Sequence, residues 1–100
     1  MRIRLAPQAR ADLDEIWLYI ARESGSIPTA TRLVNTITDK FNLLAQYPFV
    51  DRSLESSQRP NIHTFAAGNY LIFYNPRQEE LRILRILHTS RDAYAVFSQE

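Results

Sequence analysis

The chain has 100 residues, a length that fits one domain able to bury roughly 60–70% of the surface of its unfolded state. Hydrophobic residues make up 45% of it, which excludes an intrinsically disordered protein. It has no cysteine, so disulfide frameworks and thiolate metal sites are also excluded. A formal net charge of only +1 excludes the strong positive field with which many proteins bind nucleic acid nonspecifically.

The opening segment MRIRLAP has no apolar stretch of the kind that secretory signals carry, and no part of the chain reaches the ~18–20 apolar residues of a membrane span. We therefore expect a soluble, cytosolic protein, and the lack of cysteine agrees with a reducing compartment. Lys40 is the only lysine among the 12 basic residues. Arginine suits carboxylate and phosphate partners held by two hydrogen bonds, although codon usage in a GC-rich genome explains the same bias.

The first half of the chain predicts a strand followed by two helices. Polar and apolar residues alternate over 1–6, as in a strand. Pro7 suits the first turn of a helix, and a 3.6-residue apolar period extends that helix over 7–24. A second stripe of the same period predicts a helix over 27–47, ended by Pro48. Each helix has one apolar face, so we expect an αα-hairpin that packs on a flat surface.

The second half predicts a loop and then a sheet. Residues 48–60, PFVDRSLESSQRP, are polar, have proline at both ends and show no period, which indicates a loop. Strands are expected over 61–67 and 70–75, joined by a tight turn at Gly68-Asn69. A last strand is expected over 80–88 and a short helix over 90–98. We therefore predict one α+β domain over residues 1–100, of β-αα-βββ order with a C-terminal helix.

The last strand, LRILRILH, is apolar on both faces, as central strands usually are. On a regular pleat its residues divide into two sets, Leu81, Ile83, Arg85 and Leu87 on one face and Arg82, Leu84, Ile86 and His88 on the other. A buried arginine rarely lacks a partner. We expect Arg85 or Arg82 to meet a carboxylate, a backbone carbonyl or a ligand.

The residues after this strand predict the start of a helix. Thr89 fits the N-cap position and Asp92 the acidic partner of a capping box. Two residues stay unexplained, His88 and Arg91, and both lie where a strand passes into a helix and side chains often face a cleft. His88 can serve as a general acid or base. The alternative is that it hydrogen-bonds a neighbour such as Asp92.

Four segments together resemble the ParE-type toxins of the RelE/ParE superfamily, the toxins of bacterial type II toxin–antitoxin pairs. They read ARADLDEIWLYIARES, ATRLVNTITDKFNLLAQYP, RPNIHTFAAGNYLIFYNP and LRILRILHTSRD. The Arg-Pro pair, the GNYLIFY hairpin and the final H-x-x-R-D are the most specific of these features. The chain departs from the family pattern at Asn61 and His63, where glycine and arginine are common. The resemblance implies an antiparallel sheet packed against the αα-hairpin.

The resemblance also implies a function and partners. The expected partner is a ParD-like, DNA-binding antitoxin, and the expected target of the ParE branch is DNA gyrase, poisoned by binding and without catalysis. We expect no cofactor, no metal, no membrane association and no direct sequence-specific DNA binding. Candidate target-binding residues are Arg59, Arg85, His88, Arg91, Tyr94 and Phe97. For the two aromatic residues the alternative is packing of the tail on the sheet.

Two other functions stay open. One is a ribosome-dependent messenger RNA endoribonuclease of the RelE type, with Arg59, Arg85 and His88 or Arg91 around the phosphate. The sequence offers no lysine clamp for it and no histidine–tyrosine pair near the chain end, which favours the ParE branch. The other is a decayed toxin that retains only antitoxin binding. In every case we expect an antitoxin segment with acidic residues to cover apolar surface beside the arginines.

Overall fold

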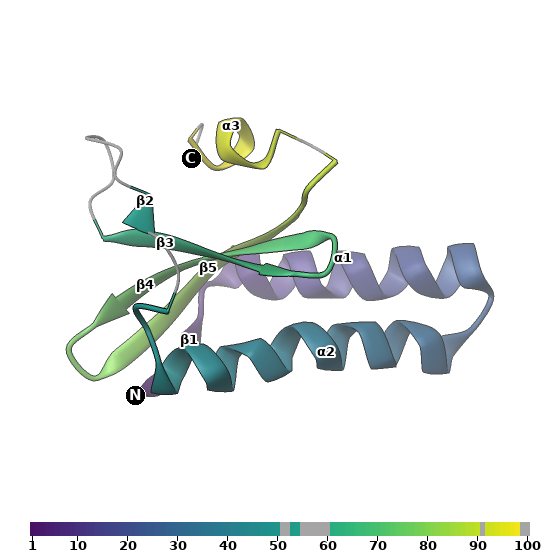
Figure 1. Ribbon diagram of the computed structural model, residues 1–100. Coiled ribbons are helices and arrows are strands. Elements are labelled where there is room, and N and C mark those ends of the chain that lie inside the picture. Colours follow the sequence, from purple (N-terminus) through teal and green to yellow (C-terminus); the bar gives the residue numbers. More distant parts are fainter. Residues whose placement is uncertain (51–52, 55–60, 91, 99–100) are drawn as a thin grey trace.

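The structure, a computed structural model, describes residues 1–50, 53–54, 61–90 and 92–98 (Figure 1). Its helices and strands are, in chain order, β1 (Arg2–Leu5), α1 (Pro7–Ser24), α2 (Ile27–Gln46), β2 (Ser53–Leu54), β3 (Ile62–Ala67), β4 (Tyr70–Arg77), β5 (Glu80–His88) and α3 (Ala93–Ser98). Within the described residues the strands form one five-stranded sheet in the order β1-β5-β4-β3-β2. Figure 1 shows α1 and α2 along one face of this sheet and α3 on the other. The predicted α+β class is confirmed.

One detail of the predicted sheet is wrong, because the sheet is mixed and not purely antiparallel. β5 pairs with β4 in antiparallel fashion but with β1 in parallel, from Arg2 opposite Glu80 to Leu5 opposite Ile83. Tight turns force the neighbours β3, β4 and β5 to alternate in direction. β1 has no hairpin link to β5, so the chain can return beside it in either direction.

Local sequence sets where the two long helices begin and end. Pro7 lies in the first turn of α1, where its missing N–H breaks no helical bond. Gly25 ends α1 in the left-handed conformation with φ of 64°, which glycine adopts at little cost. The hydroxyl of Ser26 caps α2 by accepting the Thr29 N–H at 3.2 Å. Only Gly25 and Ser26 separate the helices, so α1 and α2 form an αα-hairpin.

The main core lies between this hairpin and the sheet. The large side chains in it with no exposed surface are Ile37, Leu44, Ile72, Tyr74, Leu81 and Ile83. A smaller cluster lies on the other face, where Phe97 of α3 packs on Phe73 and Leu87. The sheet is therefore covered on both faces, which agrees with the apolar character of β4 and β5.

The segment 48–60, expected as one loop, contains the two-residue strand β2. Ser53 lies opposite His63 and Leu54 opposite Ile62, so β2 extends the sheet beyond β3. The polar residues of this segment gave no strand signal. Backbone pairing along the open edge of β3 does not require an apolar pattern, because it uses only main-chain N–H and C=O groups.

The hairpin between β4 and β5 is longer than predicted. β4 continues to Arg77, where residues 70–75 were expected, and Pro76 lies inside the strand opposite Leu81. Proline is a common sequence signal for the end of a strand. Here it is tolerated because the pairing of β4 with β3 reaches only to Tyr74, so the end of β4 is an edge on that side.

The pairing of β4 with β5 contains a β-bulge. Phe73 lies opposite Arg85. The next residue, Tyr74, lies opposite Ile83, which leaves Leu84 without a partner in β4. A bulge inserts one residue into a strand and turns the side chains near it.

The bulge makes the predicted alternation of β5 wrong. Leu81 and Ile83 point into the core under the helices, as expected for one face, but Ile86 joins them there. Leu84 and Leu87 pack instead toward α3. The residues that face α1 and α2 and those that face α3 therefore exchange positions in the alternation at the bulge. No pattern in the sequence predicts this change.

The tail helix is shorter than predicted and begins differently. α3 starts at Ala93, and the Asp92 carboxylate accepts the Ala95 N–H at 3.2 Å. Asp92 is thus the capping residue, and the prediction of Thr89 in that role is wrong. The N–H of Thr89 instead donates to the carbonyl of Asn69 at 2.8 Å, which ties the end of β5 to the β3–β4 turn.

The core predicts a large difference between two isoleucines of α2. Ile37 has no exposed surface, whereas Ile27 is 63% exposed. Ile37→Ala should lower the free energy of unfolding by about 2–5 kcal/mol, because it removes buried methyl groups and leaves a cavity. Ile27→Ala should change it by less than about 0.5 kcal/mol. Urea titration of both variants measures the difference, and equal losses would contradict the packing of α2.

Candidate functional site

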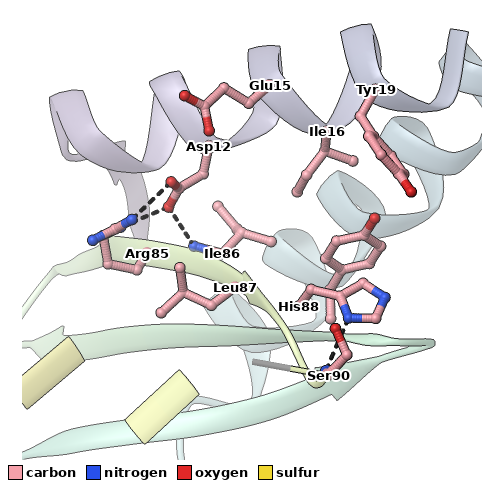
Figure 2. A pocket seen from close by; sticks show the side chains of 10 residues that line it. Asp12, Glu15, Ile16, Tyr19, Arg85, Ile86, Leu87, His88 and Ser90 are labelled. Atoms are coloured by element: carbon pink, nitrogen blue, oxygen red, sulfur yellow. Dashed lines mark hydrogen bonds and ion pairs between the residues drawn. The ribbon is translucent and has the colours of Figure 1, made fainter. Parts of the chain in front are cut away.

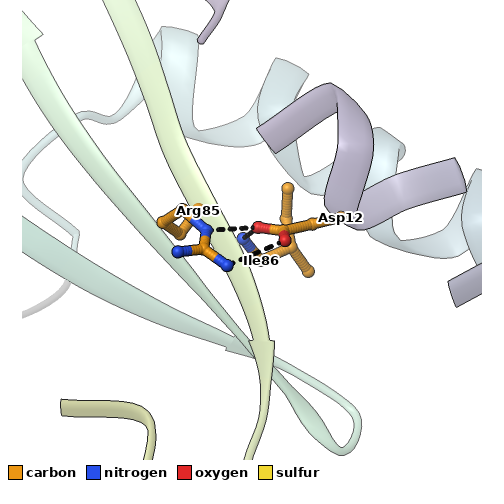
Figure 3. A network of polar contacts seen from close by, with 3 residues as sticks. All are labelled: Asp12, Arg85 and Ile86. Carbon is orange, nitrogen blue, oxygen red and sulfur yellow. Dashed lines mark hydrogen bonds and ion pairs between the residues drawn. The ribbon is translucent and has the colours of Figure 1, made fainter. Parts of the chain in front are cut away.

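A buried ion pair joins α1 to β5. Nε of Arg85 donates to Oδ2 of Asp12 at 2.7 Å, and Nη2 donates to Oδ1 at 3.0 Å. The same Oδ2 accepts the backbone N–H of Ile86 at 2.9 Å (Figure 3). The two side chains are only 14% and 10% exposed. The expectation that Arg85 or Arg82 meets a carboxylate is confirmed for Arg85.

Asp12 was not predicted from the sequence as the partner of Arg85. A signal for it was present, because Ala9, Asp12 and Ile16 recur on one side of α1 and all three are buried. A charged residue on the apolar face of a helix is buried when that face packs, so it needs an oppositely charged partner on the surface against which the helix packs.

An open cleft of about 420 Å³ lies beside this ion pair, between α1 and the end of β5 (Figure 2). The residues that line it are Asp12, Glu15, Ile16, Tyr19, Tyr70, Arg85, Ile86, Leu87, His88 and Ser90. Helix α1 supplies one wall, and β5 with the residues after it supplies the other. The cleft thus contains two of the residues selected from the sequence, Arg85 and His88.

His88 is held in one orientation by two neighbours. Its Nδ1 accepts the backbone N–H of Ser90 at 2.9 Å. Its ring meets the ring of Tyr70 edge to face, with centroids 5.0 Å apart and an interplanar angle of 87°. Because Nδ1 accepts, the neutral imidazole carries its proton on Nε2 and offers a donor there. The partner expected from the sequence, Asp92, caps α3 instead.

The two tyrosines of the cleft differ in environment. Tyr70 is buried and Tyr19 is 60% exposed. Burial, and secondly the nearby Tyr19, raise the pKa of the Tyr70 hydroxyl above its usual value of 10.0. The Tyr70 hydroxyl therefore stays protonated and uncharged at neutral pH.

The other selected residues lie elsewhere. Phe97 stacks on Phe73 with centroids 4.5 Å apart, as the packing alternative expected, and is 4% exposed. Tyr94 touches Phe73 edge to face at 5.7 Å but remains 45% exposed. Both belong to α3, on the face of the sheet opposite α1 (Figure 1). Two further candidates, Arg59 and Arg91, lie outside the described residues.

The described part of the chain contains no group of three or more histidine, aspartate or glutamate side chains arranged to hold a metal ion. Its helices include none that is both long and apolar enough to cross a membrane.

Comparison with known proteins agrees with this architecture. The model of the family "ParE toxin of type II toxin-antitoxin system, parDE" matches residues 3–93. Toxin ParE1 of Caulobacter vibrioides is 28% identical over 92 residues, which cover 92% of this chain and 93% of that protein.

Two solved structures show the same fold. A chain of the chromosomal ParDE system from P. aeruginosa superposes with a TM-score of 0.75 and 23% identity, covering 88% of this chain and 95% of that one. A chain of the E. coli DinJ–YafQ complex gives a TM-score of 0.59 and 16% identity, covering 90% of this chain and 96% of that one.

The ion pair predicts a steep cost for removing one charge. Asp12→Asn should lower the free energy of unfolding by about 3 kcal/mol, because the Arg85 guanidinium loses its carboxylate in a desolvated place. Asp14→Asn removes a charge from an exposed position of the same helix and should cost less than about 0.5 kcal/mol. Chemical denaturation measures both variants.

A double variant tests whether the cost comes from the unpaired charge. Asp12→Asn combined with Arg85→Met should recover most of the stability lost by Asp12→Asn alone, since no buried charge then lacks a partner. Additive losses in the double variant would show that the pair is not coupled in this way.

Proposed function

We propose that this chain, which belongs to the ParE toxin family of type II toxin–antitoxin systems, inhibits DNA gyrase by binding to it. We also propose that it acts in the bacterial cytoplasm and is neutralised there by a ParD-like antitoxin. The observation that carries this proposal is the match of the family model to residues 3–93. That range includes every residue that lines the cleft. The match therefore extends over the whole candidate site as well as the scaffold.

The hydrogen bonds that Arg85 forms with Asp12 support a function in binding over one in catalysis. Metal-free RNA cleavage needs a cation at the phosphate, a base for the 2′-hydroxyl and an acid for the leaving oxygen. Two nitrogens of the Arg85 guanidinium bond to Asp12, so this arginine serves to join α1 to β5. A guanidinium turned toward a carboxylate is poorly placed to bind a phosphate as well.

The orientation of His88 supports the same conclusion. Its Nδ1 lone pair is occupied by the Ser90 N–H, so the neutral ring presents a proton donor at Nε2 and no base. Glu15 is the remaining carboxylate of the cleft, and Figure 2 shows it well separated from His88. An acid and a base acting on one ribose phosphate would need to lie closer together.

The proposed target surface contains two kinds of residue. His88 and Tyr94 are partly exposed and contact the target directly. Arg85 and Phe97 hold these residues in place, through the ion pair and through the packing of α3 respectively. The other two candidates from the sequence, Arg59 and Arg91, lie outside the described residues.

Exposed apolar side chains support the proposed antitoxin. The large ones on the described surface, away from the cleft and each at least 42% exposed, are Met1, Leu18, Ile27, Tyr47, Phe49, Val50 and Tyr94. Phe49 and Val50 are adjacent in the chain, and a patch of neighbouring exposed apolar side chains is a usual mark of a protein interface. An antitoxin segment that covers it would also prevent the toxin from reaching its target.

A supercoiling assay tests the proposed target. Purified protein added to gyrase and relaxed plasmid should block supercoiling or accumulate cleaved DNA, and premixing with the antitoxin encoded by the adjacent reading frame should restore activity. Tyr94→Ala should weaken inhibition about tenfold, as loss of an interface tyrosine typically does. Tyr47→Ala is the matched control, because Tyr47 is 58% exposed at the end of α2.

The same assay separates the alternatives. Unaffected gyrase at a large excess of protein would refute the proposed target. Cleavage of messenger RNA in a translation extract, abolished by His88→Ala, would then establish the RelE-type endoribonuclease. Absence of both effects, and of growth inhibition on expression without antitoxin, would indicate a decayed toxin.

A further inference from the structure

The wall of the cleft that α1 provides contains two side chains without a role so far. Glu15 is exposed and forms no ion pair within the described residues. Tyr19 is 60% exposed. Neither residue is needed for the core, yet both line the cleft. Both side chains are therefore open to contact by a partner.

The charges of the cleft favour a cation. The charged residues that line it are two carboxylates, Asp12 and Glu15, and one guanidinium, Arg85. Asp12 and Arg85 compensate each other through their two hydrogen bonds. Glu15 is then the uncompensated charge, and with neutral His88 the lining carries a net charge of −1. A positive group entering the cleft gains a partner, and a negative group meets repulsion.

The spacing along α1 fits one particular cation. Glu15 and Tyr19 are four residues apart on α1, and Figure 2 shows their side chains pointing away from each other, with Ile16 between them. Ile16 lies next to them and is buried, which gives the cleft an apolar floor. A carboxylate, an apolar floor and an aromatic ring in a row match the head and the stem of a long cationic side chain.

We propose that this cleft binds an arginine side chain presented by a protein partner, with its guanidinium on the Glu15 carboxylate and its stem running toward the Tyr19 ring. Arginine fits better than lysine, because its planar guanidinium can bond a carboxylate through two hydrogens. The stem of the side chain covers Ile16. This site adds a function to Glu15 and Tyr19 and does not depend on gyrase being the target.

The other end of the cleft supplies donors for the main chain of the same partner. The Nε2–H of His88 and the hydroxyl of Ser90 are available there, and a peptide carbonyl is their natural acceptor. The Tyr70 hydroxyl keeps its proton because burial raises its pKa, so it adds no negative charge beside His88. The cleft thus offers acceptors at one end and donors at the other, an arrangement that fixes the direction of a bound segment.

Titration with small probes followed by NMR tests this site in the full chain. N-acetylarginine amide at millimolar concentration should shift the resonances of Glu15 and Tyr19. N-acetylcitrulline amide, which has the same shape without the charge, should bind about fivefold more weakly or not at all. N-acetyllysine amide should also bind more weakly than the arginine probe.

Variants at exposed positions complete the test, and none of them should affect folding. Glu15→Gln should abolish the preference for the arginine probe, and Tyr19→Leu should reduce it. Glu23→Gln, at an exposed position of α1 that does not line the cleft, should leave it unchanged. Equal shifts with the arginine and citrulline probes, or arginine shifts that persist in Glu15→Gln, would overturn the proposal. Lysine binding as tight as arginine would overturn the assignment of a guanidinium held by two hydrogen bonds.

Discussion

The domain depends on one buried carboxylate. Asp12 accepts three hydrogen bonds, two from the Arg85 guanidinium and one from the backbone of Ile86, and these bonds cross from α1 to β5. A carboxylate removed from water is stable only when such donors replace its hydration. The three donors also define a unique position for α1, since a shift of the helix by one residue would leave both charges without a partner. The cleft between α1 and the end of β5 has its shape because this position is fixed.

This fixed geometry suits a protein that acts by recognition. The rigid parts of the cleft are the ion pair and the oriented imidazole of His88, and both are stabilised by contacts within the molecule. The side chains with few contacts, Glu15 and Tyr19, lie at the surface. A pre-organised floor with exposed side chains around it reduces the entropy lost when a partner binds.

The fold could be predicted from the sequence, but only part of the site could, because the site depends on contacts between residues distant in the chain. The amphipathic helices and the turn at Gly68, with φ of 60°, depend on local preferences that a residue pattern records. The bulge at Leu84 depends on how two distant strands fit together, and no local preference marks it. The same holds for Asp92, which caps α3 in place of Thr89 because the chain after β5 is first tied to Asn69. The partner of Arg85 was predictable as a class of group but not as a residue, because the two residues are 73 positions apart.

The order of strands in the sheet has a consequence for the synthesis of the protein. β1 is the first strand to be made and β5 the last, yet the two are neighbours, with Ile3 opposite Leu81. A ribosome releases the chain from its N-terminus, so β1 and α1 emerge long before the strand that completes their packing. Neither the parallel pairing of β1 nor the Asp12–Arg85 ion pair can form until β5 has been translated. The native cleft therefore arises only after β5 has been translated, and a product truncated before β5 lacks it altogether.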